Sequence, residues 1–184
     1  MVEKTKEYIF DGDIFQCVVS RRFEADYKNS LINAYRVLRS TNPSPYMVYM
    51  SIDGDEIIST SPETLVKLQN GVLNTFPIAG SRPRGKTDTE DNALADELIH
   101  DEKELAEHNM LVDLGRNDIG KISEFNSVKV TKYQEVLRYS KIMHICSEVE
   151  GKLKDGLDAF DAIESLLPAG TLSGAPKIRA CEII

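Results

Sequence analysis

The sequence predicts an α+β fold with antiparallel strands, and two features lead to this prediction. Strand-like segments rich in β-branched residues are joined by Asp53-Gly54-Asp55 and by Asn70-Gly71, which are typical hairpin turns. The segment 101–120 instead has apolar residues at helical spacing, so one face of a helix should pack inward. Short hairpin connections favour antiparallel sheets over the parallel sheet of βαβ proteins.

Length and composition indicate a soluble globular protein of one domain. The 184 residues are 41% hydrophobic and 28% charged, which is enough to bury a core and is not typical of disorder. The formal net charge is -8 and no cluster of Lys and Arg stands out, which argues against a nucleic-acid binder. No apolar run is long enough to cross a membrane and residues 1–10 have no signal-peptide core, so we expect a cytoplasmic protein. The cysteines form no CxxC pair, and we expect reduced core residues at Cys17, Cys146 and Cys181.

In the first half of the chain, the spacing predicts two helices and five strands. The first helix, over 2–10, is broken by Asp11-Gly12-Asp13, and the second, over 30–39, ends before Asn42-Pro43-Ser44-Pro45. Runs rich in β-branched and aromatic residues predict strands over 14–23, 46–52, 56–60, 65–69 and 72–78.

In the second half, helices flank a group of three strands. Helices are expected over 89–100, 101–120 and 157–167, and strands over 127–130, 133–139 and 142–149. The third helix ends at Pro168-Ala169-Gly170. A loop of small residues, 171–176, then leads into a last helix that reaches Ile184 without a C-terminal glycine.

The helix over 101–120 carries the first candidate for chemistry. Glu104, Glu107 and His108 are three and four residues apart, so they should be neighbours on one helix face. Two carboxylates held one turn apart on a rigid helix suit a hard divalent cation, which prefers oxygen ligands and keeps waters or substrate oxygens in its shell. A solvated helix face accounts for the same spacing, and the spacing alone leaves both interpretations open.

A competing interpretation comes from Gly80–Thr87, which matches the phosphate-loop pattern GxxxxGK(S/T) between an expected strand and an expected helix. It would make the protein a P-loop nucleotide hydrolase, with Asp113 as a magnesium ligand. Three points count against it. Pro83 removes a backbone N–H donor, acidic residues crowd the start of the next helix, and Asp113 lies within a helix rather than at a strand end.

Seven segments stand out together: GDIFQCVVSRRF, NPSPYMVY, TSPETL, PIAGSRPRG, DEKELAEHNMLVDLGRNDIGK, IMHICSEV and PAGTLSGAPKIRACEII. In this order and spacing they resemble the chorismate-binding domain of the anthranilate synthase large subunit. The resemblance implies antiparallel sheets packed as a sandwich with flanking helices. Residues 1–184 would then be part of a single chorismate-binding catalytic domain, without the family's N-terminal regulatory region and without the C-terminal end of the domain.

The resemblance also implies a reaction, in which chorismate and ammonia become anthranilate and pyruvate with Mg²⁺ as cofactor and a glutamine amidotransferase subunit as the source of ammonia. Glu107 matches the family's metal ligand, with Glu104 beside it. Glu63 matches the general acid that protonates the departing ring hydroxyl, a role that needs a largely buried carboxyl. His144 matches the histidine associated with the later elimination of pyruvate.

Further matches concern the substrate and the choice of nucleophile. Gly80 and Ser81 match positions that contact chorismate, and Thr171 falls in the family's substrate-lining loop. Isochorismate and salicylate synthases have a lysine where this chain has Gln16, because they must activate water. Aminodeoxychorismate synthases of the usual type have a nucleophilic lysine where this chain has Ala79. Gln16 and Ala79 together therefore favour anthranilate as the product.

Two departures from the family limit what this chain should do alone. Pro45, Tyr46 and Met47 match half of the pocket for L-tryptophan, the feedback inhibitor, and the other half belongs to the absent N-terminal region. Beyond Ile184 the family continues into a segment with a substrate-binding arginine and a second glutamate for Mg²⁺. We therefore expect a chain that is weakly active at best, or a catalytically inactive fragment of a chorismate-utilising enzyme.

Overall fold

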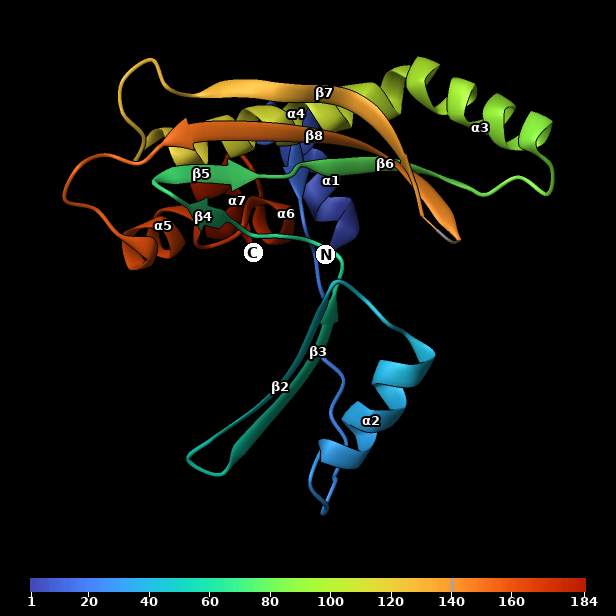
Figure 1. The fold of residues 1–184 in the computed structure, drawn as a ribbon, viewed down its shortest axis with the longest axis vertical. Helices are drawn as coiled ribbons and strands as arrows, with labels where there is room; N and C mark the ends of the chain where they lie inside the picture. The colour runs from blue at the N-terminus through green and yellow to red at the C-terminus, as the bar shows by residue number, and fades with distance from the viewer. Residues whose placement is uncertain (140) are drawn as a thin grey trace. The chain divides into compact units, whose positions relative to one another are not determined.

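The computed structural model describes residues 1–139 and 141–184, which divide into two compact units. The first unit comprises Met1–Val19 and Leu65–Ile184, and the second comprises Ser20–Thr64. Each unit combines helices with antiparallel strands (Figure 1), so the predicted α+β class is confirmed. Within the described residues, no helix is long and apolar enough to cross a membrane.

A five-stranded antiparallel sheet forms the centre of the first unit. Its strands are β4 (Lys67–Gln69), β5 (Val72–Thr75), β6 (Ile78–Pro83), β7 (Lys129–Arg138) and β8 (Ile142–Lys152). The long strand β8 pairs with β7 along one edge and with β5 and then β6 along the other (Figure 1). The predicted turn at Asn70 and Gly71 joins β4 to β5, and both residues have a positive φ, 53° and 76°, as a type I′ turn requires.

Strand β7 is irregular. Its register with β8 shifts between Val130 and Lys132 and again between Lys132 and Glu135. Gln134, within the second shift, has a left-handed φ of 55°. Such extra residues are the mark of β-bulges, which bend a strand without ending it. This is why the two strands predicted over 127–130 and 133–139 are one strand.

Helices pack against this sheet and close the core. The helices of the first unit are α1 (Val2–Phe10), α3 (Asp88–His100), α4 (Glu102–Gly120), α5 (Ala159–Leu166), α6 (Gly170–Ser173) and α7 (Lys177–Ile183). Helix α4 packs on β5, β6 and β8, and α3 packs on β6, β7 and β8. One apolar cluster joins α4 and α5 to the sheet through Leu73, Val112, Ile119, Val149, Ala162 and Leu166. A second cluster joins α3 to the sheet through Ala95, Leu98, Met143 and Ile145.

A two-stranded ribbon lies outside the main sheet. It consists of β1 (Gln16–Cys17) and β9 (Gly174–Ala175), with Gln16 opposite Ala175 and Cys17 opposite Gly174. The strand predicted over 14–23 is therefore much shorter than expected, because β9 offers it only two residues to pair with.

Two further predictions need correction. The strand predicted over 72–78 ends at Thr75, and a separate strand, β6, runs from Ile78 to Pro83, so that it covers the first half of the phosphate-loop segment. Of the cysteines expected in the core, only Cys146 is buried, whereas Cys17 is half-buried and Cys181 is exposed.

The second unit consists of α2 (Ile32–Thr41) and the hairpin of β2 (Tyr46–Ile52) and β3 (Asp55–Ser61). Glu56 of β3 accepts hydrogen bonds from the Tyr49 hydroxyl (2.7 Å), the Ser30 hydroxyl (2.8 Å) and the Leu31 backbone N–H. These bonds, that from Tyr49 above all, hold the pKa of Glu56 below its ordinary value. One carboxylate thus ties the start of α2 to the hairpin.

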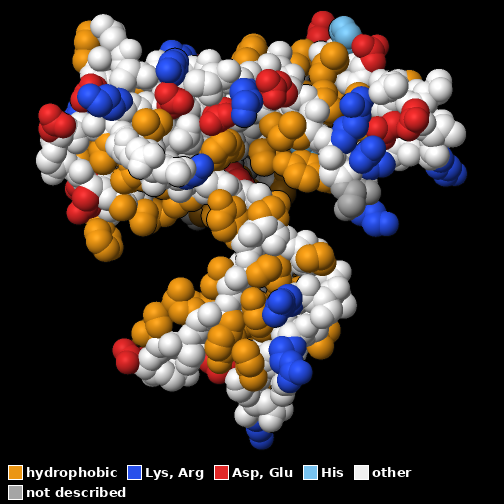
Figure 2. Space-filling view, viewed as in Figure 1, with side chains coloured by type: hydrophobic (Ala, Val, Ile, Leu, Met, Phe, Trp, Pro, Cys, Tyr) orange, Lys and Arg blue, Asp and Glu red, His pale blue; other side chains and the backbone are white. Residues whose placement is uncertain are grey.

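Both units expose apolar side chains, as the hydrophobic surface in Figure 2 shows. In the first unit, Phe160 of α5, Leu172 of α6 and Ile178 of α7 are 81%, 73% and 78% exposed. In the second unit, the β2–β3 hairpin exposes Ile52 and Ile57. Apolar surface of this extent is typical of faces that other protein segments cover.

Candidate functional site

The first turn of α4 is fixed by an aspartate cap. Asp101 has extended backbone angles, and its Oδ1 accepts hydrogen bonds from the N–H groups of Lys103 (3.0 Å) and Glu104 (3.1 Å). These donors would otherwise have no partner at the start of the helix. The cap and the nearby Arg82 hold the pKa of Asp101 below its ordinary value. The helix therefore begins at a defined place, which also places the carboxylates in its first two turns.

The predicted neighbours on α4 do not share one exposed face. His108 is fully buried against the sheet, where its Nε2 lies 2.6 Å from the Ser147 hydroxyl of β8, and burial lowers its pKa. Glu104 and Glu107 are half-buried. The reason is that His108 is one turn from Leu111 and Val112, which belong to the packed face. The interpretation of His108 as part of the charged face is therefore wrong.

A cavity of about 680 Å³ lies between α4 and the β1–β9 ribbon. Its polar lining includes Gln16 of β1 together with Lys103 and Glu107 of α4, and its apolar lining includes Met110 and Leu114. The amide oxygen of Gln16 is buried and has no hydrogen-bond partner among the described residues. A buried acceptor without a partner is costly, so Gln16 has a hydrogen-bonding capacity that the described contacts leave unused. Two residues predicted from the sequence, Gln16 and Glu107, are thus brought together.

A second group of predicted residues meets on β6 and its neighbour β8. Ser81 lies opposite His144, and the ring Nδ1 of His144 is 3.2 Å from the Gly80 carbonyl oxygen. This bond needs the proton on Nδ1, which leaves a lone pair on Nε2 to accept a proton. Gly80 has a φ of 78°, and a Cβ at this position would lie 3.2 Å from Glu104 Oε2. Glycine therefore allows the Glu104 carboxylate to approach the strand closely.

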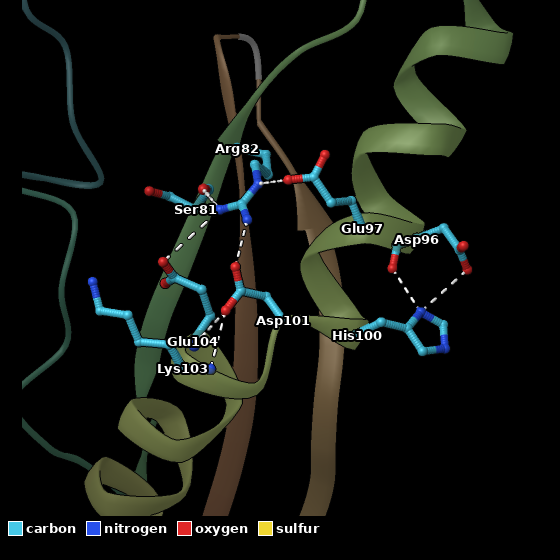
Figure 3. A network of polar contacts seen from close by, with 8 residues as sticks. All are labelled: Ser81, Arg82, Asp96, Glu97, His100, Asp101, Lys103 and Glu104. Atoms are coloured by element: carbon cyan, nitrogen blue, oxygen red, sulfur yellow. Dashed lines mark hydrogen bonds and ion pairs between the residues drawn. The ribbon is translucent and has the colours of Figure 1, made fainter.

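Sequence reasoning missed Arg82, which joins β6 to the start of α4 (Figure 3). Its Nε donates to Glu97 Oε1 (2.9 Å), its Nη2 to Asp101 Oδ2 (2.8 Å) and its Nη1 to the Ser81 carbonyl oxygen (2.9 Å). Glu104 Oε1 lies 3.8 Å from Nη1. The signal in the sequence was an arginine within the GSRPRG segment and three acids spread over the helices that follow, and only the fold makes them neighbours.

The donor set fits magnesium in part. Within the described residues, no group of three His, Cys, Asp or Glu side chains is arranged to hold a metal ion. Glu104 and Glu107 nevertheless supply two carboxylates one turn apart, on the same helix as the cavity. Mg²⁺ is usually held by one or two protein carboxylates while waters and substrate oxygens complete its shell. These two residues would hold the ion.

The other predicted site residues lie elsewhere. Thr171 is half-buried in α6, which packs on α4 where Gly170 meets Leu114 of the cavity lining. Glu63 follows β3 in the second unit and is exposed, so the burial expected for it is not present in that unit. The residues matched to tryptophan binding also belong to the second unit: Pro45, Tyr46 and Met47.

The geometry of Gly80–Thr87 does not suit a phosphate. Gly80–Pro83 lies in β6, which is antiparallel to β8 and not part of a βαβ unit. The Gly85 N–H donates to Asp91 Oδ1 (2.8 Å) and the Lys86 N–H to Glu90 Oε2 (2.8 Å). Carboxylates therefore occupy the backbone donors that would have to cradle a phosphate, and like charge would repel it. The structure argues against the nucleotide-hydrolase interpretation.

The hydrogen-bonded carboxylate of Asp91 should make the stability of the fold depend on pH. Asp91 also pairs with Arg84 (Nε to Oδ1, 2.7 Å), and this pair above all holds the pKa of Asp91 below its ordinary value of 3.8. A carboxyl with a lowered folded-state pKa stabilises the fold above its unfolded pKa, and this stabilisation is lost as the pH falls through the folded value. We expect Asp91→Asn to reduce stability at neutral pH and to flatten the loss of stability below pH 3.8.

Urea denaturation from neutral pH to below this value measures the effect. Asp96→Asn is the matched control, because Asp96 is in the same helix with a side chain 74% exposed. If Asp91→Asn and the unaltered chain lost the same unfolding free energy on acidification, the prediction would be contradicted.

Known proteins resemble this chain over its whole length. A family model described as chorismate binding enzyme matches residues 1–184. The chain is 55% identical over 183 residues to anthranilate synthase component 1 of Acetivibrio thermocellus and 51% identical over 183 residues to aminodeoxychorismate synthase component 1 of Bacillus subtilis. Each match covers 100% of this chain, but only 37% and 39% of those relatives.

A solved structure of a related protein has the same fold as this chain. Anthranilate synthase component I from Streptococcus pneumoniae superposes with a TM-score of 0.85 at 52% identity, over 97% of this chain and 39% of that one. The resemblance inferred from the sequence motifs is thus confirmed, and the chain belongs to the chorismate binding enzyme family.

Proposed function

We propose that this chain supplies the Mg²⁺-binding helix and part of the chorismate-binding surface of an anthranilate synthase, which forms anthranilate and pyruvate from chorismate and ammonia. The observation that carries the proposal is the cavity beside α4, which Gln16 and Glu107 both line. Relatives named anthranilate synthase component 1 support it.

Gln16 is suited to ammonia rather than to water as the nucleophile. An amide does not act as a general base, so it cannot activate water, but its oxygen can accept a hydrogen bond from an N–H group. Ammonia attacks without the help of a general base, so the site needs only to hold it in position beside the substrate. Ala79 offers no amine, so a covalent intermediate at that position is excluded.

The remaining roles are those that the resemblance to the family implies. When bound, Mg²⁺ supplies positive charge for the carboxylates of chorismate. Glu104 and Glu107 hold the ion, while Gly80, Ser81 and Thr171 line the substrate. Glu63 donates a proton to the departing ring hydroxyl. The free lone pair on His144 Nε2 accepts the ring proton when pyruvate leaves and the ring becomes aromatic.

In the complete protein, we propose that a glutamine amidotransferase subunit provides the ammonia. Pro45, Tyr46 and Met47 of the second unit would contribute to feedback inhibition by L-tryptophan. The chain spans 37% of the length of its relative from Acetivibrio thermocellus.

Aminodeoxychorismate formation is the second candidate, and the relative from Bacillus subtilis favours it. Both reactions join chorismate and ammonia, but anthranilate formation also releases pyruvate. Product analysis of a complete protein containing this chain distinguishes them, because only anthranilate formation yields pyruvate. Aminodeoxychorismate as the main product would contradict the assignment to anthranilate.

A thermal melt with Mg²⁺ tests the site in this chain. A ligand that binds only the folded state raises the melting midpoint, by an amount equivalent to about 2.7 kcal/mol at a hundred times its Kd. We expect chorismate to raise the midpoint, and we expect Glu107→Gln to remove the Mg²⁺-dependent part of the rise.

Glu102→Gln is the control, because Glu102 is an exposed residue in the first turn of the same helix. ATP in place of chorismate tests the phosphate-loop interpretation. A rise with ATP alone, or a rise with chorismate that Glu107→Gln leaves intact, would contradict the proposed site.

A further inference from the structure

We propose that Arg82 is a positioning residue that sets the place of Glu104, and through it the affinity of the site for a divalent cation. The inference rests on the proposed function, because it assumes that Glu104 and Glu107 hold the ion. Arg82 itself touches neither the cavity lining nor His144 among the contacts described. Its side chain is only 18% exposed, and its partner Asp101 is 31% exposed.

The guanidinium of Arg82 lies at different distances from its three carboxylate neighbours (Figure 3). Glu97 and Asp101 accept hydrogen bonds at 2.9 and 2.8 Å, whereas Glu104 Oε1 stays 3.8 Å away, beyond hydrogen-bond range. Two carboxylates therefore form hydrogen bonds with Arg82, whereas Glu104 forms only a longer ion pair with it. Glu104 keeps its oxygen lone pairs for another partner.

Arg82 also reaches the backbone of Glu104 through Asp101. One oxygen of Asp101 accepts from Arg82, and the other caps α4 by accepting the Glu104 N–H at 3.1 Å. The chain of contacts runs from β6 to the helix cap and on to the peptide of the candidate ligand. If Arg82 lost its forked geometry, the first turn of α4 could shift against β6 and carry Glu104 with it.

The side chain of Glu104 is confined from a second direction. Its Oε2 lies close enough to Gly80 that a Cβ there would be 3.2 Å away. Arg82 on one side and the bare Gly80 backbone on the other hold the carboxylate beside β6. One positive charge among three negative ones leaves an excess of negative charge, which favours the approach of a cation.

The role of Arg82 can be separated from its charge. A purely electrostatic role predicts that removal of the arginine charge tightens cation binding, since a repulsive neighbour is gone. A positioning role predicts that Arg82→Lys, which keeps the charge but loses the planar fork, weakens binding. Partners that orient a metal ligand typically contribute 10–100-fold to metal affinity, and we expect a loss of about tenfold for Arg82→Lys.

The experiment measures Mn²⁺ binding to the folded chain by electron paramagnetic resonance, with Mn²⁺ as a spectroscopic substitute for Mg²⁺. The variants are Arg82→Lys, Asp101→Asn and Glu97→Gln. A thermal melt of each variant, compared with that of the unaltered chain, checks that it is folded. Asp101→Asn keeps the cap acceptor but loses the carboxylate, and should weaken Mn²⁺ binding as Arg82→Lys does. Glu97→Gln is the matched control, because this residue is 61% exposed, pairs with the same guanidinium and lies outside α4. Its Mn²⁺ affinity should stay unchanged.

Glu107→Gln separates failure of this inference from failure of the proposed function. If Glu107→Gln weakens Mn²⁺ binding while Arg82→Lys leaves it unchanged or tightens it, the positioning role is overturned and the metal site stands. If Glu107→Gln has no effect, the metal site itself is overturned, and the inference with it. Equal losses of affinity for Glu97→Gln and Arg82→Lys would also overturn the positioning role, because they would reflect the charge network as a whole.

Discussion

Gly174→Ala should destabilise the first unit strongly and disturb the position of Gln16. Gly174 has a φ of 146° and a ψ of -167°, a region that only glycine adopts readily and that costs another residue about 1–3 kcal/mol. In addition, a Cβ would lie 2.1 Å from the Gln16 carbonyl oxygen and 2.9 Å from Ala180 Cβ. The first of these neighbours is backbone and cannot rotate away. We expect a loss of about 3 kcal/mol or more in the free energy of urea unfolding.

Two glycines of the same unit serve as controls for Gly174. Gly156 has a φ of 85° with nothing within 4 Å of an added Cβ, so Gly156→Ala isolates the backbone cost, about 1 kcal/mol. Gly120, the last residue of α4, is open and has no positive φ, so Gly120→Ala should be neutral or slightly stabilising. If Gly174→Ala cost no more than Gly156→Ala, the close pairing of β1 with β9 would be contradicted. The Mg²⁺-dependent response to chorismate should also be lost in Gly174→Ala.

Lys177→Met should produce the second large loss of stability. The Lys177 ammonium lies 2.7 and 2.9 Å from the two oxygens of Asp118 and 3.0 Å from the Leu166 carbonyl oxygen. The two side chains are 12% and 10% exposed. Removal of one partner leaves a nearly buried charge without its main compensation, which typically costs 3–5 kcal/mol. We expect the free energy of unfolding, measured with urea, to fall by about 3 kcal/mol. This is the lower end of the range, because Lys121 remains 3.2 Å from Asp118.

A double-mutant cycle tests the origin of this loss. Asp118→Leu combined with Lys177→Met removes both charges, and should recover most of the stability that Lys177→Met alone loses. Lys121→Met should cost under about 1 kcal/mol, because its side chain is 54% exposed. Similar losses for Lys121→Met and Lys177→Met would show that burial of the pair is not the cause.

Local patterns predicted those parts of the fold that depend on neighbours in the sequence. The helix over 101–120 and the turn at Asn70 and Gly71 were predicted correctly, because apolar spacing and left-handed turn residues are local properties. The length of β1 was not, because it depends on β9, more than 150 residues away in the chain, which offers only two partners. The phosphate-loop pattern failed for a related reason: β8, which pairs with Ser81–Pro83, lies far along the sequence.

The candidate site was predicted unevenly for the same reason. The motifs indicated Gln16 and Glu107, and the fold places both at one cavity. His108 was assigned to the wrong face, because one helical turn carries both packed and exposed positions and only the sheet decides between them. Arg82 was missed because its role depends on ion pairs with acidic residues that lie 15 to 22 positions later in the sequence. Only the folded structure brings these residues close to Arg82.

The bulges in β7 have a consequence for solubility. Among the described residues β7 pairs with β8 on one side only, so its other side is the edge of the sheet. An open, regular edge invites strands from other molecules, and proteins block this with bulges and charged side chains. β7 has two register shifts, and Lys129 and Lys132 form ion pairs with Glu150 and Glu148 of β8 at 3.2 and 2.8 Å. An irregular register and lysines on an edge strand both disfavour pairing with a strand of another molecule.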